Sequence, residues 1–199
     1  MQTGRRSLKL SLPPLWLMGV CLFLPAVRSC EKLESPAQLL FDSKPLFAMM
    51  LSPYVLAQLL VVVAVVALAR NRVTPFAMWA TAVLAGLAAS SAGVLAVLGF
   101  DGHGLTAQLW RVWAGVALAG GLLVIARSWR YDEWTRLQRL HTAYTLFTLP
   151  MAALLARIVV EDGVHRVGVG AWLFLAAYAA VVVVHARELL SSRRDRLRS

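Results

Sequence analysis

Residues 45–69 read PLFAMMLSPYVLAQLLVVVAVVALA, and residues 73–100 read VTPFAMWATAVLAGLAASSAGVLAVLGF. The two stretches are 25 and 28 residues long, and neither contains a charged side chain. A helix that crosses the hydrocarbon core of a bilayer needs about 20 such residues. Each stretch therefore predicts a membrane-spanning helix, and the basic segment between them, Arg70 to Arg72, predicts a short loop outside the membrane.

The composition of the whole chain also indicates a membrane protein. Of its 199 residues, 59% are hydrophobic and 15% are charged, whereas soluble domains are about 45–50% apolar and about 25% charged. A disordered chain is excluded, because disorder requires low hydrophobicity. The net charge of +10 would suit a nucleic-acid partner. No such partner is expected, because the chain has too few polar residues to build a soluble basic face.

Six hydrophobic segments predict an all-α, polytopic membrane helix bundle that forms a single domain over residues 1–199. The fourth and fifth segments are long enough only if Arg111 and Arg157 extend to the interface, as long basic side chains can. A capping box that starts at Ser35 predicts an additional short interfacial helix over residues 36–42. The six segments cover about residues 10–27, 46–69, 75–99, 107–126, 140–160 and 167–186.

The basic residues of the loops predict the orientation. With the N-terminus in the cytoplasm, the cytoplasmic side carries 14 Lys and Arg against four Asp and Glu, and the other side carries six against six. Because loops rich in basic residues stay in the cytoplasm, both termini are expected there. The same residues would attract anionic lipid headgroups. The abundance of Ala, Arg, Val and Leu suggests a bacterial inner membrane.

The first segment has a second interpretation as a secretory signal. Basic residues near the N-terminus precede an apolar core over residues 10–24, and the small side chains of Val27 and Ser29 have the spacing of a cleavage site before Cys30. Cleavage there would leave five spans with the same orientation. An uncleaved anchor and a cleaved signal both fit the sequence.

Two histidines form the first candidate site. His141 lies 22 residues before Gly163, in the last hairpin turn, and His185 lies 22 residues after it. In two antiparallel helices, equal offsets place both rings at one depth, where two imidazoles can hold a haem iron or a metal ion. Haem b is therefore a candidate cofactor. The alternative is that both rings lie in the headgroup zone and bond water, lipid phosphate or backbone. The cysteines lack the neighbours of a metal site.

A second candidate site lies at the opposite, outer end. Arg111 and Arg157 lie deeper than the other outer charges, with His103 and His165 in the outer turns. A charge inside the apolar zone is costly and indicates a functional site. These residues could form a vestibule for an anion or a lipid headgroup. Alternatively, the two arginines extend to the interface and pair with the acidic residues of the outer loops.

Small residues four positions apart predict the faces through which the helices pack. The fourth segment offers Gly115 and Ala119. The third segment has two such stripes, which predicts neighbouring helices on both of its sides. The stripes are Ala82, Gly86 and Ser90, and Ala85, Ala89 and Gly93.

The sequence contains no motif of a catalytic centre or a phosphate-binding loop. The expected function is therefore that of an accessory or structural subunit, bound to other membrane proteins through its small-residue faces. The haem-binding and anion-binding interpretations are the alternatives. Pro150 predicts a kink in the fifth segment near Leu146, whose carbonyl loses its hydrogen-bond donor.

Overall fold

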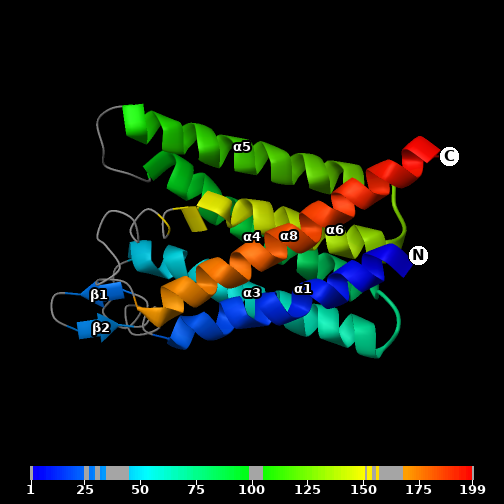
Figure 1. Cartoon of the computed structure of the whole chain (residues 1–199), viewed down its shortest axis with the longest axis horizontal. Coiled ribbons are helices and arrows are strands. Elements are labelled where there is room, and N and C mark those ends of the chain that lie inside the picture. The colour runs from blue at the N-terminus through cyan, green and yellow to red at the C-terminus, as the bar shows by residue number, and fades with distance from the viewer. Residues whose placement is uncertain are drawn as a thin grey trace.

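The computed structural model describes residues 2–24, 27–29, 32–34, 45–98, 105–150, 152–153, 156 and 168–198. The start of α1 and the end of α8 lie at one end of an elongated helical bundle, and a two-stranded hairpin lies at the other (Figure 1). The elements are α1 (Gln2–Val20), a 3-10 turn (Cys21–Phe23), β1 (Val27–Ser29), β2 (Lys32–Glu34), α3 (Pro45–Ala69), α4 (Pro75–Leu98), α5 (Leu105–Ser128), α6 (Glu133–Phe147) and α8 (Val169–Arg198).

Local hydrogen bonds shape the turn between α3 and α4, at the end of the bundle that holds the start of α1 and the end of α8. Asn71 adopts a left-handed conformation with φ of 53°, and the amide of Arg72 donates to the Ala67 carbonyl (3.2 Å) to close α3. Thr74 then caps α4, because its hydroxyl accepts the amide of Ala77 (3.1 Å) while Pro75 occupies the first helical position. The third segment, expected over 75–99, accordingly starts where α4 starts.

Within the described residues, three helices are long and apolar enough to cross a bilayer, and they indicate a membrane protein. Their apolar spans are Pro75–Gly93 of α4, Arg111–Ser128 of α5 and Val169–Glu188 of α8. In α3, the apolar stretch whose side chains the structure describes is Tyr54–Ala69, which is shorter than these three spans. The expected bundle is thus helical in the described residues, apart from β1 and β2.

The first segment differs from the expectation of a helix over residues 10–27. Its helix begins at Gln2, because the basic residues that mark the edge of the apolar run do not interrupt a helix. It ends early: Leu24 is extended (φ −92°, ψ 145°), as expected of a residue that precedes a proline, Pro25. Val27 then belongs to β1, which pairs antiparallel with β2 and places Val27 opposite Glu34.

The last two segments are also shifted. α6 begins at Glu133 rather than near residue 140, because Asp132 caps it and accepts the amide (3.4 Å) and the hydroxyl (2.7 Å) of Thr135. It ends at Phe147, next to the kink that Pro150 predicts near Leu146. α8 continues to Arg198, since no Gly or Pro follows residue 170. The interfacial helix expected over 36–42 lies outside the described residues.

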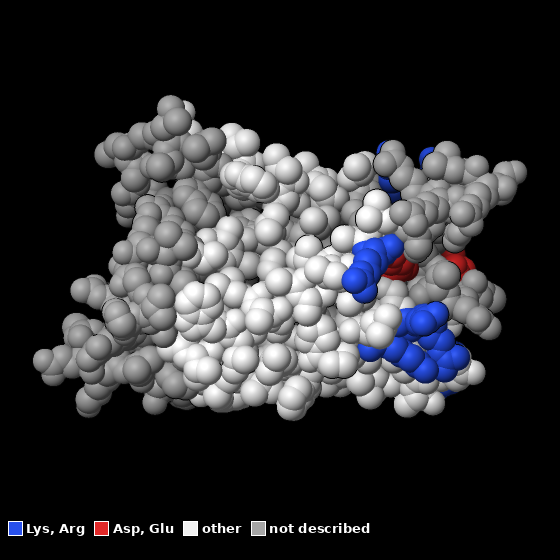
Figure 2. Space-filling model, viewed as in Figure 1, with Lys and Arg blue, Asp and Glu red and all other residues white. Residues whose placement is uncertain are grey.

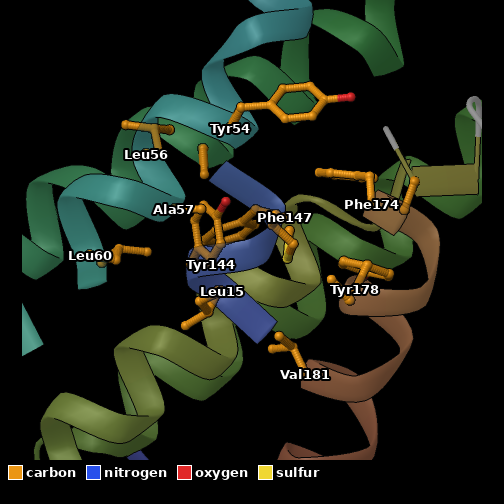
Figure 3. Packing of buried hydrophobic residues seen from close by; sticks show 14 of the residues in the cluster. Leu15, Tyr54, Leu56, Ala57, Leu60, Tyr144, Phe147, Phe174, Tyr178 and Val181 are labelled. Carbon is orange, nitrogen blue, oxygen red and sulfur yellow. The ribbon is translucent and has the colours of Figure 1, made fainter. Parts of the chain in front are cut away.

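The core lies where α1, α3, α6 and α8 meet (Figure 3). Aromatic rings dominate it: Tyr54 of α3 and Phe174 of α8 have ring centroids 4.6 Å apart, and Phe147 of α6 packs on Gly121 of α5. Leu15 and Met18 of α1 are completely enclosed. α1 is therefore an integral helix of this bundle.

Close backbone contacts hold α1 in place. Gly4 lies so near α6 that an added β-carbon would come 2.9 Å from the Cα of Thr135. At the other end of the helix, Gly19 packs on the side chain of Gln58, whose amide donates to the Trp16 carbonyl (2.9 Å). Glycine is needed at both positions because a side chain there would meet backbone or a bonded side chain.

Candidate functional site: a buried polar cluster between α6 and α8

One face of α6 carries polar side chains although it points into the bundle. Gln138, His141, Thr142 and Thr145 occupy positions i, i+3, i+4 and i+7, so they share one side of the helix. All four are buried. Two residues of α8, Tyr178 and His185, face them and are also buried. We call these six residues the polar cluster.

Hydrogen bonds orient His185 from one side of its ring. Its Nδ1 lies 3.2 Å from the Thr142 hydroxyl and 3.3 Å from the Gln138 amide nitrogen. The Thr142 hydroxyl donates its single proton to the Gln138 carbonyl (3.2 Å). The opposite ring nitrogen, Nε2, is buried and has no hydrogen-bond partner among the described residues.

His141 is completely buried, and neither of its ring nitrogens has a partner in the described part of the chain. It lies close enough to His185 for the two rings to interact electrostatically. The structure thus brings together the two histidines that the sequence predicts at one depth. A buried polar atom without a partner costs about 1–3 kcal/mol, so three such nitrogens in one cluster are a feature that requires an explanation.

Two points of contact fix the register between α6 and α8. The Tyr178 hydroxyl donates to the Thr145 carbonyl (2.8 Å). Seven residues later in α8, His185 contacts Thr142 and Gln138, which lie three and seven residues before Thr145 in the antiparallel α6. The Thr145 carbonyl lies in the last turn of α6, and the Thr148 hydroxyl donates to it as well (3.0 Å). One of the two contacts therefore lies at the C-terminal end of α6.

The polar cluster supplies nitrogen donors but not a complete metal site. No group of three or more His, Cys, Asp or Glu with metal-site geometry occurs among the described residues. The unpartnered ring nitrogens are enclosed by neighbouring side chains, so a porphyrin would need α6 and α8 to move apart. Nearer the end of the bundle that holds the start of α1, Glu188 of α8 lies near Ser7 of α1 and Arg139 of α6.

Most of the predicted outer site lies outside the described residues. Arg111 is exposed on α5. His103, Arg157 and His165 lie outside the described residues, so the vestibule stays a prediction.

Lys and Arg side chains gather at the end of the bundle that holds the start of α1 and the end of α8, which we call the basic end (Figure 2). Three arginines lie over aromatic rings there, and the sequence analysis missed these contacts. The guanidinium of Arg139 lies 3.9 Å from the Tyr131 ring centroid. Arg136 lies 5.3 Å from that of Trp129, and Arg5 lies 5.4 Å from that of Trp134. Such contacts hold a charge over an aromatic face. Only the alternation of Trp or Tyr with Arg in residues 129–136 could have indicated them.

Gln138 and Thr142 were also missed as partners of His185. Their spacing from His141 places them on its face of the helix, and this was the available signal. No family model matches the chain, and the comparisons with curated proteins and with solved structures give no match.

Proposed function

We propose that this protein is a multi-pass membrane protein with six spanning segments in a single domain and both termini in the cytoplasm, and that it acts as an accessory or structural subunit of a membrane assembly. The location of the start of α1 and the end of α8 at one end of the bundle supports an even number of crossings (Figure 1). The arginine-rich turns at that end support a cytoplasmic location, and the composition supports a bacterial inner membrane.

We also propose that the first segment is retained rather than cleaved. Leu8, Leu15, Met18 and Cys21 all reach the interior of the bundle and are at most 1% exposed. Removing α1 would uncover the faces of α3, α6 and α8 against which it packs. A cleaved signal would have no such role in the packing.

The observation that carries the subunit proposal is the orientation of the small residues of α4. Ala85 is buried in the bundle, as one of the two stripes predicts, but Ala82, Gly86 and Ser90 are exposed. A β-carbon on Gly86 would meet no atom of the described residues within 4 Å. Glycine facing the bilayer leaves backbone open to a close approach by another helix.

α5 has the same property on its outer face. Gly115 and Ala119 were expected to pack within the bundle, but they are exposed, and the buried small residues are Ala114, Ala117 and Gly121. A β-carbon on Gly115 would also meet no described atom within 4 Å. Two adjacent helices thus present small residues outward, and the partner that fits them is a transmembrane helix of another protein.

A photocrosslinker at Ser90, an exposed residue of the same stripe as Gly86, tests this proposal in native membranes. We expect one discrete, identified membrane-protein partner, lost when Gly86 is replaced by Leu. The matched control, Val83→Leu, enlarges an exposed neighbour without covering backbone and should retain the crosslink. A crosslink to lipid alone, together with a chain that is monomeric after gentle extraction with no co-purifying protein, would contradict the proposal.

Haem binding by His141 and His185 is the second candidate. Three unpartnered ring nitrogens favour it, as does the anchoring of His185 through Nδ1, since ligating histidines are held through the ring nitrogen that does not bind the metal. Haem would supply redox chemistry, and the two helices would separate to admit it. An absorption spectrum decides: a Soret band absent from the His141→Ala variant supports haem, and a colourless wild-type protein ends the idea.

A further inference from the structure

A groove opens between the start of α4 and the end of α5, with α6 as its floor. Its volume is about 340 Å³, within the range of small-molecule sites. Its walls are mainly apolar: Met78 and Trp79 of α4 face Ile125 of α5 and Trp129, the residue after α5, above Leu140 of α6. We call it the α4–α5 groove.

The exposed tryptophans place this groove at a membrane interface. Trp79 and Trp129, on its two walls, are 73% and 72% exposed. Indole rings concentrate where hydrocarbon meets headgroups, because they are apolar but carry one hydrogen-bond donor. The groove therefore extends from the level of the headgroups into the apolar zone, along helices that are long enough to span it.

Positive charge surrounds the mouth of the groove. Arg70 and Arg72, in the turn before α4, are exposed, as are Arg127 and Arg130 around the end of α5. Arg136 lies in the lining. Its guanidinium donates to the carbonyls of Trp129 and Tyr131 (3.2 Å each), and it bonds no carboxylate among the described residues. Glu133 is the single acidic residue of the described lining.

We infer that the α4–α5 groove binds one anionic phospholipid. The acyl chain lies between α4 and α5, and the phosphate lies against the arginines of the two adjacent turns. An apolar groove with a basic mouth selects an amphipathic ligand with a negative head, and guanidinium groups match phosphate in charge and geometry. Ala82 lines this groove as well as facing outward on α4, but Gly86 and Gly115, which carry the subunit proposal, are not among the lining residues.

The test uses the full-length protein in nanodiscs of phosphatidylcholine with one tenth phosphatidylglycerol. After transfer to mild detergent, native mass spectrometry counts the lipids that stay bound. We expect one retained phosphatidylglycerol per chain. Ile125→Trp fills the groove and should abolish retention, whereas Leu122→Trp, one turn earlier on an exposed position of the same helix, should not.

A second variant tests the charges without touching the packing. Arg72→Gln with Arg130→Gln should weaken retention about thirty-fold, the loss expected for two arginines at a lipid surface. Equal retention of phosphatidylcholine and phosphatidylglycerol, no retained lipid in the wild type, or unchanged retention in both variants would overturn the inference. Displacement of the lipid by a co-purifying peptide in the groove would overturn it as well.

Discussion

Helices α6 and α8 are held together by side-chain hydrogen bonds, whereas α4 and α5 expose glycine, alanine and large apolar side chains on their outer faces. The first pair meets through Tyr178 and His185, each bonded to a defined atom of α6. The second pair packs its buried faces through small residues such as Ala85 and Ala117. In a bilayer, hydrogen bonds fix a register, and small residues allow close approach without fixing a partner. The α6–α8 side therefore has a fixed register, whereas the outer face of the α4–α5 side is open to lipid and to other helices.

The largest effect is expected in α1, which supports the α6–α8 side. Leu15→Ala should lower the free energy of unfolding by about 2–5 kcal/mol, because Leu15 is completely enclosed and its loss leaves a cavity. Leu10→Ala, on the same helix but exposed, should change it by less than about 0.5 kcal/mol. Unfolding in mixed micelles measures both. Equal losses would show that α1 does not pack as described.

Removing one of the two contacts of the His185 Nδ1 atom should have the next largest effect. Thr142→Val should cost about 1–2 kcal/mol, because it removes the hydroxyl that lies 3.2 Å from Nδ1 in a buried site. Nitrogen NMR of the His185 ring should also show a shifted Nδ1 resonance. Thr81→Val is the control, since its hydroxyl bonds only the Ala77 carbonyl of its own helix. An unchanged His185 spectrum would contradict the assigned network.

A smaller effect is expected at the cap of α6. Burial alone would raise the pKa of the Asp132 carboxyl, but hydrogen bonds from the Thr135 hydroxyl and amide outweigh it and hold the pKa below its usual value. Its contribution to stability is therefore complete above the unfolded pKa of about 3.9 and is lost as the pH falls through the lower folded pKa. Asp132→Ala should cost about 0.5–1 kcal/mol at pH 7, the low end for a largely exposed cap. The difference from wild type should vanish in acid.

The smallest effect is expected on the outer face of α5. Leu122→Ala should change the free energy of unfolding by less than about 0.5 kcal/mol, because that side chain is 57% exposed and exchanges bundle contacts for lipid contacts. A cost comparable to that of Leu15→Ala would mean that α5 is covered in the isolated chain, and the contrast between the two sides would fail.

Local signals predicted some boundaries well, and tertiary contacts decided the rest. Thr74 and Pro75 fixed the start of α4 in the sequence, because a cap acts within one turn. The start of α1 was misplaced because charges mark the edge of the membrane rather than the end of a helix. Val27, expected at the end of a span, forms β1, because Leu24, the residue before Pro25, is already extended.

The sequence predicted how deep the candidate site lies along the bundle, but not the individual contacts within it. Equal offsets from Gly163 brought His141 and His185 to one level, and the structure places them in one cluster. The bond from His185 to Thr142 depends on how α8 is rotated about its axis, which a single sequence does not determine. The α4–α5 groove was missed for a similar reason, because three helices and two turns contribute to it.

The most direct test of the account is the location of the two termini on the intact chain. With different epitope tags at each end, both tags should resist added protease in right-side-out membrane vesicles and be digested in inverted ones, and the N-terminal tag should stay on the full-length protein. This outcome follows from an integral α1 and an even number of crossings. Digestion of either tag in right-side-out vesicles, or loss of the N-terminal tag by cleavage before Cys30, would contradict it.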